Sequence, residues 1–222
     1  MVNRLHLYST IAEQGMVPLY YNSDAEMVKN VISACYQGGG RVFEFTNRGV
    51  NAHEVFAVAY KYAQKELPGM IIGVGSVIDA PTAALYMQMG AGFIVSPLLN
   101  IDVAKICNKR KVAWMAGCGS VTEISTAEEY GAEIVKLFPG QEVGGASFIK
   151  NVKGPMPWTS IMPSGGVEPT RANLTEWFSA GAFCVGMGSK LITKDIIVHK
   201  DFNKLTGLVR DTLALIKSVR DA

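Results

Sequence analysis

The sequence predicts an α/β fold in which eight parallel strands, each followed by a helix, close into a barrel. Short apolar runs recur eight times along the 222 residues, and a segment with helical periodicity follows each run. Strands that alternate with helices indicate a parallel sheet, and nearly continuous apolar runs are typical of strands buried on both faces. Eight such units in a chain of this length lie at the compact end of (β/α)8 TIM barrels, which typically have about 250 residues.

The expected strands are short and apolar, and most of them end in polar or glycine-rich residues. They are expected at residues 16–21, 41–46, 70–74, 92–95, 111–115, 134–138, 159–163 and 182–186. Gly15 ends a short leading helix, and Asn-Ser-Asp at 22–24 caps the second helix. The expected helices cover residues 2–14, 24 to about 38, 51–67, 79–89, 101–108, 121–130, 145–152 and 170–180, followed by a short helix and a long final helix at 201–219.

The alternative fold is an open, doubly wound sheet. It is disfavoured because no strand carries the G-x-G-x-x-G phosphate turn at the start of its helix. The chain also contains no linker, low-complexity tract or break in composition. We therefore expect a single barrel domain over residues 1–222, with a short N-terminal helix and a long C-terminal helix.

The composition is that of an ordinary globular protein, with 49% apolar residues, 18% charged residues and a formal net charge of +2. This net charge gives no argument for a nucleic-acid partner, and no window of about 18 apolar residues could cross a membrane. Residues 1–21 do not resemble a signal peptide, because charged residues interrupt each apolar run. We therefore expect a cytoplasmic protein.

The four cysteines are far apart in the sequence, and no two of them form a C-x-x-C motif. We expect them to be buried free thiols in a reducing compartment. The three histidines are also scattered, and none lies at metal-ligand spacing from another histidine or a cysteine. We expect no metal and no redox cofactor.

Lys136 lies in the middle of the sixth expected strand, within Ile-Val-Lys-Leu-Phe at 134–138. A lysine in a buried strand is costly, because desolvation disfavours its charged form. Two explanations are open. The ammonium group could reach water or a carboxylate at a strand end, or a lowered pKa could make the amine a nucleophile.

Chemistry in a barrel of this kind belongs at the carboxyl ends of the strands. The second strand ends in Glu-Phe-Thr-Asn-Arg, and its alternation places Glu44, Thr46 and Arg48 on one side. An inward Glu44 would be a natural partner for an inward Lys136. The pair alone is equally compatible with a structural ion pair that fills the barrel core.

The last two strands lead into glycine-rich loops, Pro-Ser-Gly-Gly-Val at 163–167 and Val-Gly-Met-Gly-Ser at 185–189. Exposed backbone N–H groups at such helix starts attract phosphate, and these two loops are where barrels commonly bind it. Either loop alone could simply form a tight turn. Together they favour a phosphate site formed by these two loops.

The combination suggests a reaction class. An amine nucleophile, a carboxylate for proton transfer, an arginine for a substrate carboxylate and a phosphate site are the parts of a Schiff-base carbon–carbon lyase acting on a phosphorylated 2-oxo acid. Two alternatives remain. One is a phosphate-binding isomerase or synthase without imine chemistry, and the other is a non-catalytic barrel that binds phosphorylated metabolites. Only the lyase requires the amine of Lys136.

Six motifs appear in a characteristic order and spacing. They are Glu-Phe-Thr-Asn-Arg at 44–48, Gly-Val-Gly-Ser-Val at 73–77, Val-Ser-Pro at 95–97, Val-Lys-Leu-Phe-Pro at 135–139, Pro-Ser-Gly-Gly-Val at 163–167 and Gly-Met-Gly-Ser at 186–189. On these motifs, residues 17–191 resemble the 2-keto-3-deoxy-6-phosphogluconate (KDPG) and 4-hydroxy-2-oxoglutarate (KHG) aldolases.

The resemblance implies a class I aldolase in which Lys136 forms a Schiff base with the C2 carbonyl of the substrate and Glu44 transfers protons. Cleavage would give pyruvate and glyceraldehyde 3-phosphate from KDPG, and pyruvate and glyoxylate from KHG. Arg48 and Ser76 would bind the carboxylate. The resemblance also implies a homotrimer without a cofactor. The other expected substrate-binding residues are Thr46, Pro97, Phe138, Ser164, Gly165, Gly166, Gly186, Gly188 and Ser189.

The sequence departs from the family pattern at three places. Family members often carry an arginine or lysine after the first strand, whereas Tyr-Tyr-Asn-Ser at 20–23 contains neither. Ala116 replaces a proline, and Ser164 replaces a threonine. None of these changes involves Lys136 or Glu44, so the resemblance specifies the reaction class more closely than the substrate.

Overall fold

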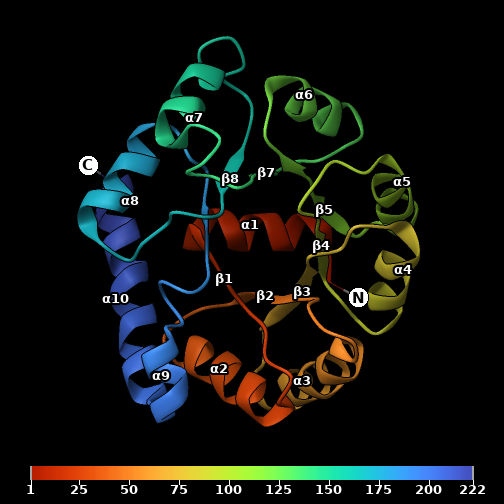
Figure 1. Ribbon diagram of the computed structural model, residues 1–222, viewed down its shortest axis with the longest axis vertical. Coiled ribbons are helices and arrows are strands. Elements are labelled where there is room, and N and C mark those ends of the chain that lie inside the picture. The colour runs from red at the N-terminus through yellow and green to blue at the C-terminus, as the bar shows by residue number, and fades with distance from the viewer. Residues whose placement is uncertain (1, 222) are drawn as a thin grey trace.

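The computed structural model describes residues 2–221, and its strands curl into a parallel barrel surrounded by helices (Figure 1). The barrel predicted from the sequence is therefore confirmed. The strands are β1 (Met16–Tyr20), β2 (Val42–Thr46), β3 (Ile71–Gly75), β4 (Phe93–Val95), β5 (Ala113–Met115), β6 (Gly117–Cys118), β7 (Val135–Leu137), β8 (Ile161–Pro163) and β9 (Val185–Met187).

The strands pair in the order β5-β4-β3-β2-β1-β9 in one sheet and β6-β7-β8 in another. Two connections join these sheets. A single residue, Ala116, separates β5 from β6, and Ser164 after β8 forms a parallel bridge with Gly186 in β9. The two sheets together therefore close the barrel.

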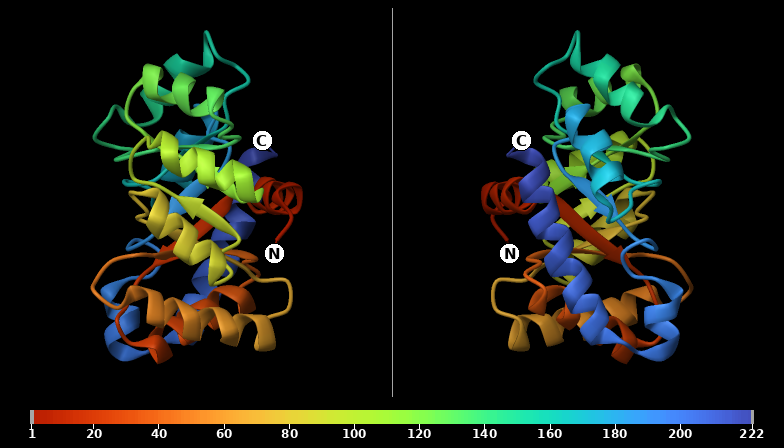
Figure 2. Two further views of the ribbon diagram at one scale, coloured as in Figure 1. Left: turned by 90° about the vertical axis from the view of Figure 1, so that its right-hand side faces the viewer. Right: turned by 90° about the vertical axis from the view of Figure 1, so that its left-hand side faces the viewer.

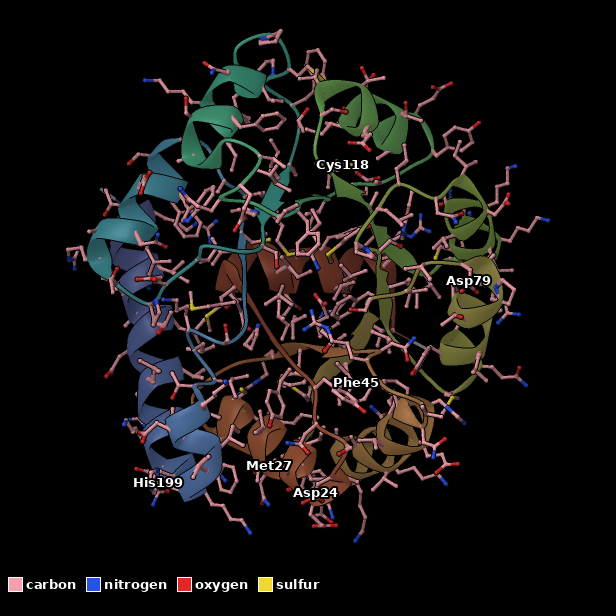
Figure 3. The ribbon with its side chains drawn as sticks, in the orientation of Figure 1. Asp24, Met27, Phe45, Asp79, Cys118 and His199 are labelled. Atoms are coloured by element: carbon pink, nitrogen blue, oxygen red, sulfur yellow. The ribbon has the colours of Figure 1, made fainter. Side chains whose placement is uncertain are left out.

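Ten helices are present within residues 2–221, and most begin where the sequence supplies a capping side chain. They are α1 (Arg4–Gln14), α2 (Ala25–Gln37), α3 (Ala52–Glu66), α4 (Ala80–Gln88), α5 (Ile101–Arg110), α6 (Val121–Glu129), α7 (Gly145–Lys153), α8 (Arg171–Ser179), α9 (Lys194–His199) and α10 (Phe202–Arg220). Asp24 and Asp79 each accept a hydrogen bond from the first turn of the helix that follows (Figure 3).

The expected elements agree with the observed ones apart from small shifts of their ends, with one correction. The strand β5 ends at Met115 as expected, but Gly117 and Cys118 form a further short strand, β6, where the sequence predicted a loop. Gly117 pairs in register with Lys136. A Cβ atom at Gly117 would overlap the main chain of Pro97, so only glycine allows this close approach.

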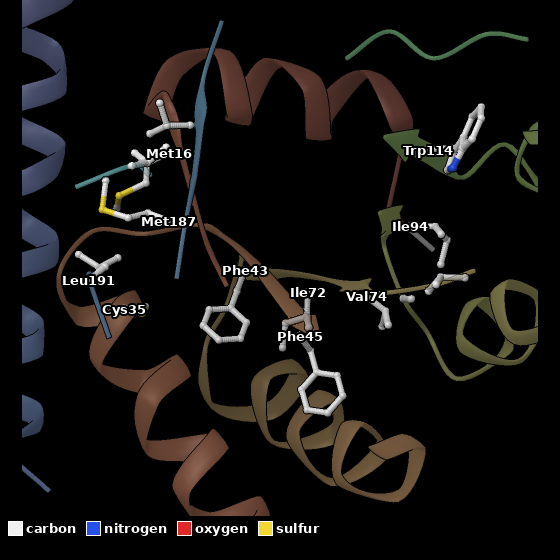
Figure 4. Close-up of a cluster of buried hydrophobic side chains, with 14 of the residues drawn as sticks. Met16, Cys35, Phe43, Phe45, Ile72, Val74, Ile94, Trp114, Met187 and Leu191 are labelled. Atoms are coloured by element: carbon white, nitrogen blue, oxygen red, sulfur yellow. The ribbon is translucent and has the colours of Figure 1, made fainter. Parts of the chain in front are cut away.

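The strands are buried on both faces. Outward side chains such as Phe43 and Phe45 pack toward α2 and α3 (Figure 4). Inward side chains form a second cluster with Leu7 and Ile11 of α1, which are fully buried against residues at the starts of the strands, such as Val42. The helix α1 therefore closes the amino-terminal end of the barrel (Figure 2).

The four cysteines are free and buried, as expected from the sequence. Burial raises the pKa of the Cys35, Cys107 and Cys118 thiols to about 12 and also raises the pKa of the Cys184 thiol. These thiols are therefore protonated at neutral pH. Within residues 2–221, no helix is both long and apolar enough to cross a membrane.

Candidate active site

Lys136 and Glu44 meet inside the barrel. Lys136 is the central residue of β7 and Glu44 the central residue of β2, and these strands belong to different sheets. The Lys136 Nζ atom lies 3.8 Å from Glu44 Oε1, and the two side chains are 7% and 1% exposed. The structure therefore places a carboxylate beside the amine. It also leaves the amine little contact with water.

The carboxylate of Glu44 is unusual for a buried group. Both of its oxygens are buried, and neither has a hydrogen-bond partner among residues 2–221. A buried ion pair that only stabilises a fold normally has its remaining lone pairs satisfied, because an unpaired buried acceptor costs roughly 1–3 kcal/mol. The free lone pairs of Glu44 therefore favour a chemical role over a purely structural one.

Glycines on β3 make the space that the carboxylate occupies. Glu44 lies in register with Gly73, and a Cβ atom at Gly73 would overlap the Phe93 ring. A Cβ atom at Gly75 would overlap the Glu44 carboxylate itself. The alternation of glycine along β3 thus lets a phenylalanine fill one level of the barrel and a glutamate the next.

Arg48 and Ser76 lie together in the loops after β2 and β3. The Nε–H of Arg48 donates a hydrogen bond to Ser76 Oγ at 3.5 Å, and Arg48 is exposed. Ser76 has a φ angle of +59°, in the left-handed region that L-residues seldom adopt. Arg48 forms no ion pair with a carboxylate in the described part of the chain, so its guanidinium group is available to an anion.

A cavity of about 500 Å³ opens at the carboxyl ends of the strands. Nine residues proposed from the sequence line it: Thr46, Arg48, Phe138, Ser164, Gly165, Gly166, Gly186, Gly188 and Ser189. The Lys136 Nζ atom lies 5.1 Å from the centre of the Phe138 ring. Phe138 also lines the cavity, so the Lys136 amine lies next to a wall of the cavity.

Four other proposed residues do not line the cavity. Lys136 and Glu44 lie one level deeper on their strands, two residues before the lining residues Phe138 and Thr46. Ser76 adjoins the cavity through its hydrogen bond to Arg48. Pro97 approaches Gly117 through its main chain and does not line the cavity.

The loops after β8 and β9 present unpaired N–H groups. Gly165 and Gly166 have φ angles of +98° and +78°. The carbonyl oxygens of Ser164 and Gly165 accept hydrogen bonds from residues 140 and 141, and the carbonyl oxygen of Gly166 accepts one from the Asn173 side chain. In residues 2–221, no hydrogen bond engages the amide N–H of Gly166, Gly188 or Ser189. Such an arrangement is typical of an anion-binding nest.

The sequence did not predict every wall of the cavity. Tyr20 at the end of β1 and Tyr21 directly after it line the cavity, and residues of the α9 region line it after β9. The contribution of α9 could not be found from local periodicity, because a six-residue helix carries little pattern. The additional lining residues from this region are Lys190, Ile192, Lys194, Ile197 and Val198.

The chain is similar in sequence to known proteins over most of its length. The family model for KDPG and KHG aldolase matches residues 7–208. The 2-dehydro-3-deoxy-phosphogluconate aldolase of Pseudoalteromonas atlantica is 32% identical over 206 residues, which are 92% of this chain and 93% of the relative. The KHG/KDPG aldolase of Escherichia coli strain K12 is 28% identical over the same share of each chain.

Solved structures are similar in fold. The KDPG aldolase of Zymomonas mobilis, solved with 3-phosphoglycerate, has a TM-score of 0.80 at 26% identity, over 93% of this chain and 94% of that one. The KDPG aldolase of Legionella pneumophila, captured with pyruvate as a covalent carbinolamine, has a TM-score of 0.83 at 22% identity, over 92% of this chain and 97% of that one. At this lower identity the similarity shows the fold alone.

We predict that Gly75→Ala lowers the free energy of unfolding by about 1–3 kcal/mol, because the new methyl group would overlap the buried Glu44 carboxylate. Gly207→Ala in α10 is the matched control. Its surroundings are open, so it should raise the free energy of unfolding by about 0.5–1 kcal/mol. Urea denaturation measures both. A Gly75→Ala variant as stable as the wild type would show that Glu44 does not pack over Gly75.

Proposed function

This chain belongs to the KDPG and KHG aldolase family and is a carbon–carbon lyase, and we propose that it cleaves a 2-oxo-3-deoxy sugar-acid phosphate through a Schiff base on Lys136. The products from KDPG are pyruvate and glyceraldehyde 3-phosphate. The single observation that carries the assignment of Lys136 is its buried amine, 3.8 Å from a carboxylate whose oxygens have no hydrogen-bond partner among the described residues.

The proposed reaction begins when the neutral amine of Lys136 attacks the C2 carbonyl carbon of the substrate. A C–N bond forms, and the carbonyl oxygen becomes the hydroxyl of a carbinolamine. Glu44, in its protonated form, donates a proton to this hydroxyl, so that water leaves and a protonated imine remains. The position of Glu44 beside the amine suits it to this transfer.

Carbon–carbon cleavage follows from the imine. Glu44, now a carboxylate, accepts the proton of the C4 hydroxyl as the C3–C4 bond breaks. The electron pair of that bond moves into the imine, giving the aldehyde product and an enamine of pyruvate. Protonation of the enamine at C3 and hydrolysis of the imine then release pyruvate and restore Lys136. One water is released and one is consumed, so the reaction is a net cleavage without an oxidant or reductant.

Two regions bind the charged ends of the substrate in this proposal. Arg48, supported by Ser76, binds the carboxylate next to the reacting carbonyl, because a guanidinium group can donate two parallel hydrogen bonds to a carboxylate. The backbone N–H groups of Gly165, Gly166, Gly188 and Ser189 bind the phosphate.

KHG is a second proposed substrate, which gives pyruvate and glyoxylate by the same steps and has no phosphate to place. The E. coli relative carries both activities in its name. The family match favours the aldolase over the isomerase or synthase and over the non-catalytic barrel. Neither of these alternatives would require the Lys136 amine. The four free thiols support a cytoplasmic location, where thiols stay reduced.

We also propose that the chain forms a homotrimer, an expectation that rests on the family resemblance. Exposed apolar side chains that follow neighbouring strands support a self-association surface: Ile78 after β3, Leu98 after β4 and Val121 after β6.

Incubation with pyruvate and borohydride is predicted to attach a pyruvate-derived group to Lys136, because reduction of the imine makes the C–N bond permanent. Peptide mapping by mass spectrometry identifies the site. Lys136→Ala should show no adduct and at least a ~10³-fold loss of pyruvate release, with an unchanged circular dichroism spectrum. Lys61→Ala, which removes an exposed lysine on α3, is the control. An unmodified Lys136 in folded protein would contradict the Schiff base and favour the isomerase or synthase, or the non-catalytic phosphate-binding barrel.

Glu44→Gln is predicted to slow aldol cleavage by roughly 10²–10⁴-fold, because the amide cannot exchange the protons that the carboxyl group transfers. Borohydride trapping of pyruvate should remain detectable, since Lys136 is still present. Steady-state assay of pyruvate release and trapping on the same sample separate these two steps. Turnover near the wild-type rate would reduce Glu44 to a packing partner of Lys136.

Light scattering is predicted to give a molar mass of about three times the 23.9 kDa of one chain. Ile78→Asp should lower this mass, because a carboxylate cannot be buried in an apolar interface without a partner. A wild-type protein with the mass of one chain at micromolar concentration contradicts the trimer.

A further inference from the structure

The walls of the active-site cavity carry an unbalanced charge. Three cationic side chains line it, Arg48, Lys190 and Lys194, and no aspartate or glutamate of the described residues is among its lining residues. A cavity lined by one sign of charge attracts ligands of the opposite sign. The three cations differ in whether a neighbouring carboxylate already neutralises them.

Lys190 is already paired. Its Nζ atom lies 2.7 Å from Glu168 Oε1, and this ion pair joins the loop after β9 to the loop after β8. Glu168 is therefore a competing anion for any ligand that approaches Lys190. Glu168 therefore balances the charge of Lys190 before any ligand binds.

Lys194 is not paired. It is the first residue of α9, exposed, and it forms no ion pair within residues 2–221. The neighbouring carboxylate of Asp195 is occupied, because its oxygens lie 3.0 Å from Lys204 Nζ and 3.1 Å from His199 Nδ1. The hydrogen bond from Lys204 lowers the pKa of Asp195, so this carboxylate remains charged and engaged away from Lys194.

The two unpaired cations reach the cavity from different sides. Arg48 follows β2 and Lys194 follows β9, and β2 and β9 flank β1 on opposite sides. Lys194 lines the same cavity as Gly188 and Ser189, whose amide N–H groups form no hydrogen bond with any described residue. A substrate with a carboxylate at one end and a phosphate at the other matches this separation of charge.

We infer that Lys194 is the specificity-determining cation that binds the distal phosphate and makes the enzyme prefer phosphorylated 2-oxo acids. This inference rests on the proposed aldolase function. The backbone N–H groups supply only partial charges, whereas a phosphate monoester carries about −1.5 to −2 at neutral pH. The ammonium group of Lys194 supplies the full positive charge that the loops lack, and its flexible stem can follow the phosphate into the cavity.

The test compares KDPG with its unphosphorylated counterpart, 2-keto-3-deoxygluconate, as substrates of the full-length protein. Lys194→Gln should raise KM for KDPG by about 10- to 100-fold with little change in kcat, and should affect the unphosphorylated substrate far less. Lys194→Arg should recover most of the loss. The advantage of the wild type over Lys194→Gln should shrink as ionic strength rises from 0.05 to 0.5 M, because salt screens exposed charges.

Two control variants distinguish the effect of Lys194 from the effect of removing any other positive charge. Lys109→Gln removes a lysine near the end of α5, outside the cavity lining, and should leave both substrates unaffected. Lys190→Gln should raise KM for KDPG less than Lys194→Gln does, because the Lys190 charge is already paired with Glu168. A larger effect from Lys190→Gln than from Lys194→Gln would overturn the inference.

The outcomes distinguish this inference from the proposed function. A wild type that prefers KDPG, together with a Lys194→Gln variant that keeps this preference, overturns only the role of Lys194. A wild type that forms the pyruvate adduct but does not discriminate between the two substrates overturns both the phosphate site and the role of Lys194. A wild type that neither traps pyruvate nor cleaves either substrate overturns the proposed function and this inference with it.

Discussion

The buried contact between Lys136 and Glu44 imposes the main constraint on this barrel. Two groups that strongly prefer water lie at one level of an interior that is otherwise filled by apolar side chains. Removing either group alone leaves the other buried without its partner. The surrounding strands must therefore provide the right space, the right register and very little water, and much of the local sequence serves this purpose.

The glycines of β3 show how that space is provided. Gly73 leaves space for the Phe93 ring, and Gly75 leaves space for the Glu44 carboxylate. The single strand β3 therefore borders both the apolar interior of the barrel and the polar layer that contains Glu44. Gly117 allows the chain of β6 to approach Pro97 and pair with Lys136. These residues contribute no functional group. Their contribution is to let larger side chains from other strands reach the centre of the barrel.

Much of the fold and part of the site could be predicted from the sequence, because both depend on short periodic patterns. Alternating strands and helices predicted the barrel, and alternation within β2 predicted that Glu44 and Thr46 face inward. The β6 strand was missed because a glycine-rich segment looks like a loop until its neighbours are known. The contribution of α9 was missed for a related reason: which residues a short helix places over a cavity depends on its packing against the start of α10, and local sequence does not record that packing.

The helix α1 has a consequence for the order of events in the proposed reaction. Leu7 and Ile11 are buried at the amino-terminal end, and the active-site cavity opens at the carboxyl ends of the strands. After cleavage, pyruvate is still tethered to Lys136 at the deepest point, while the aldehyde fragment lies between it and the exit. The aldehyde must therefore leave before pyruvate can. In the synthetic direction the order is reversed: pyruvate binds first and the aldehyde binds second.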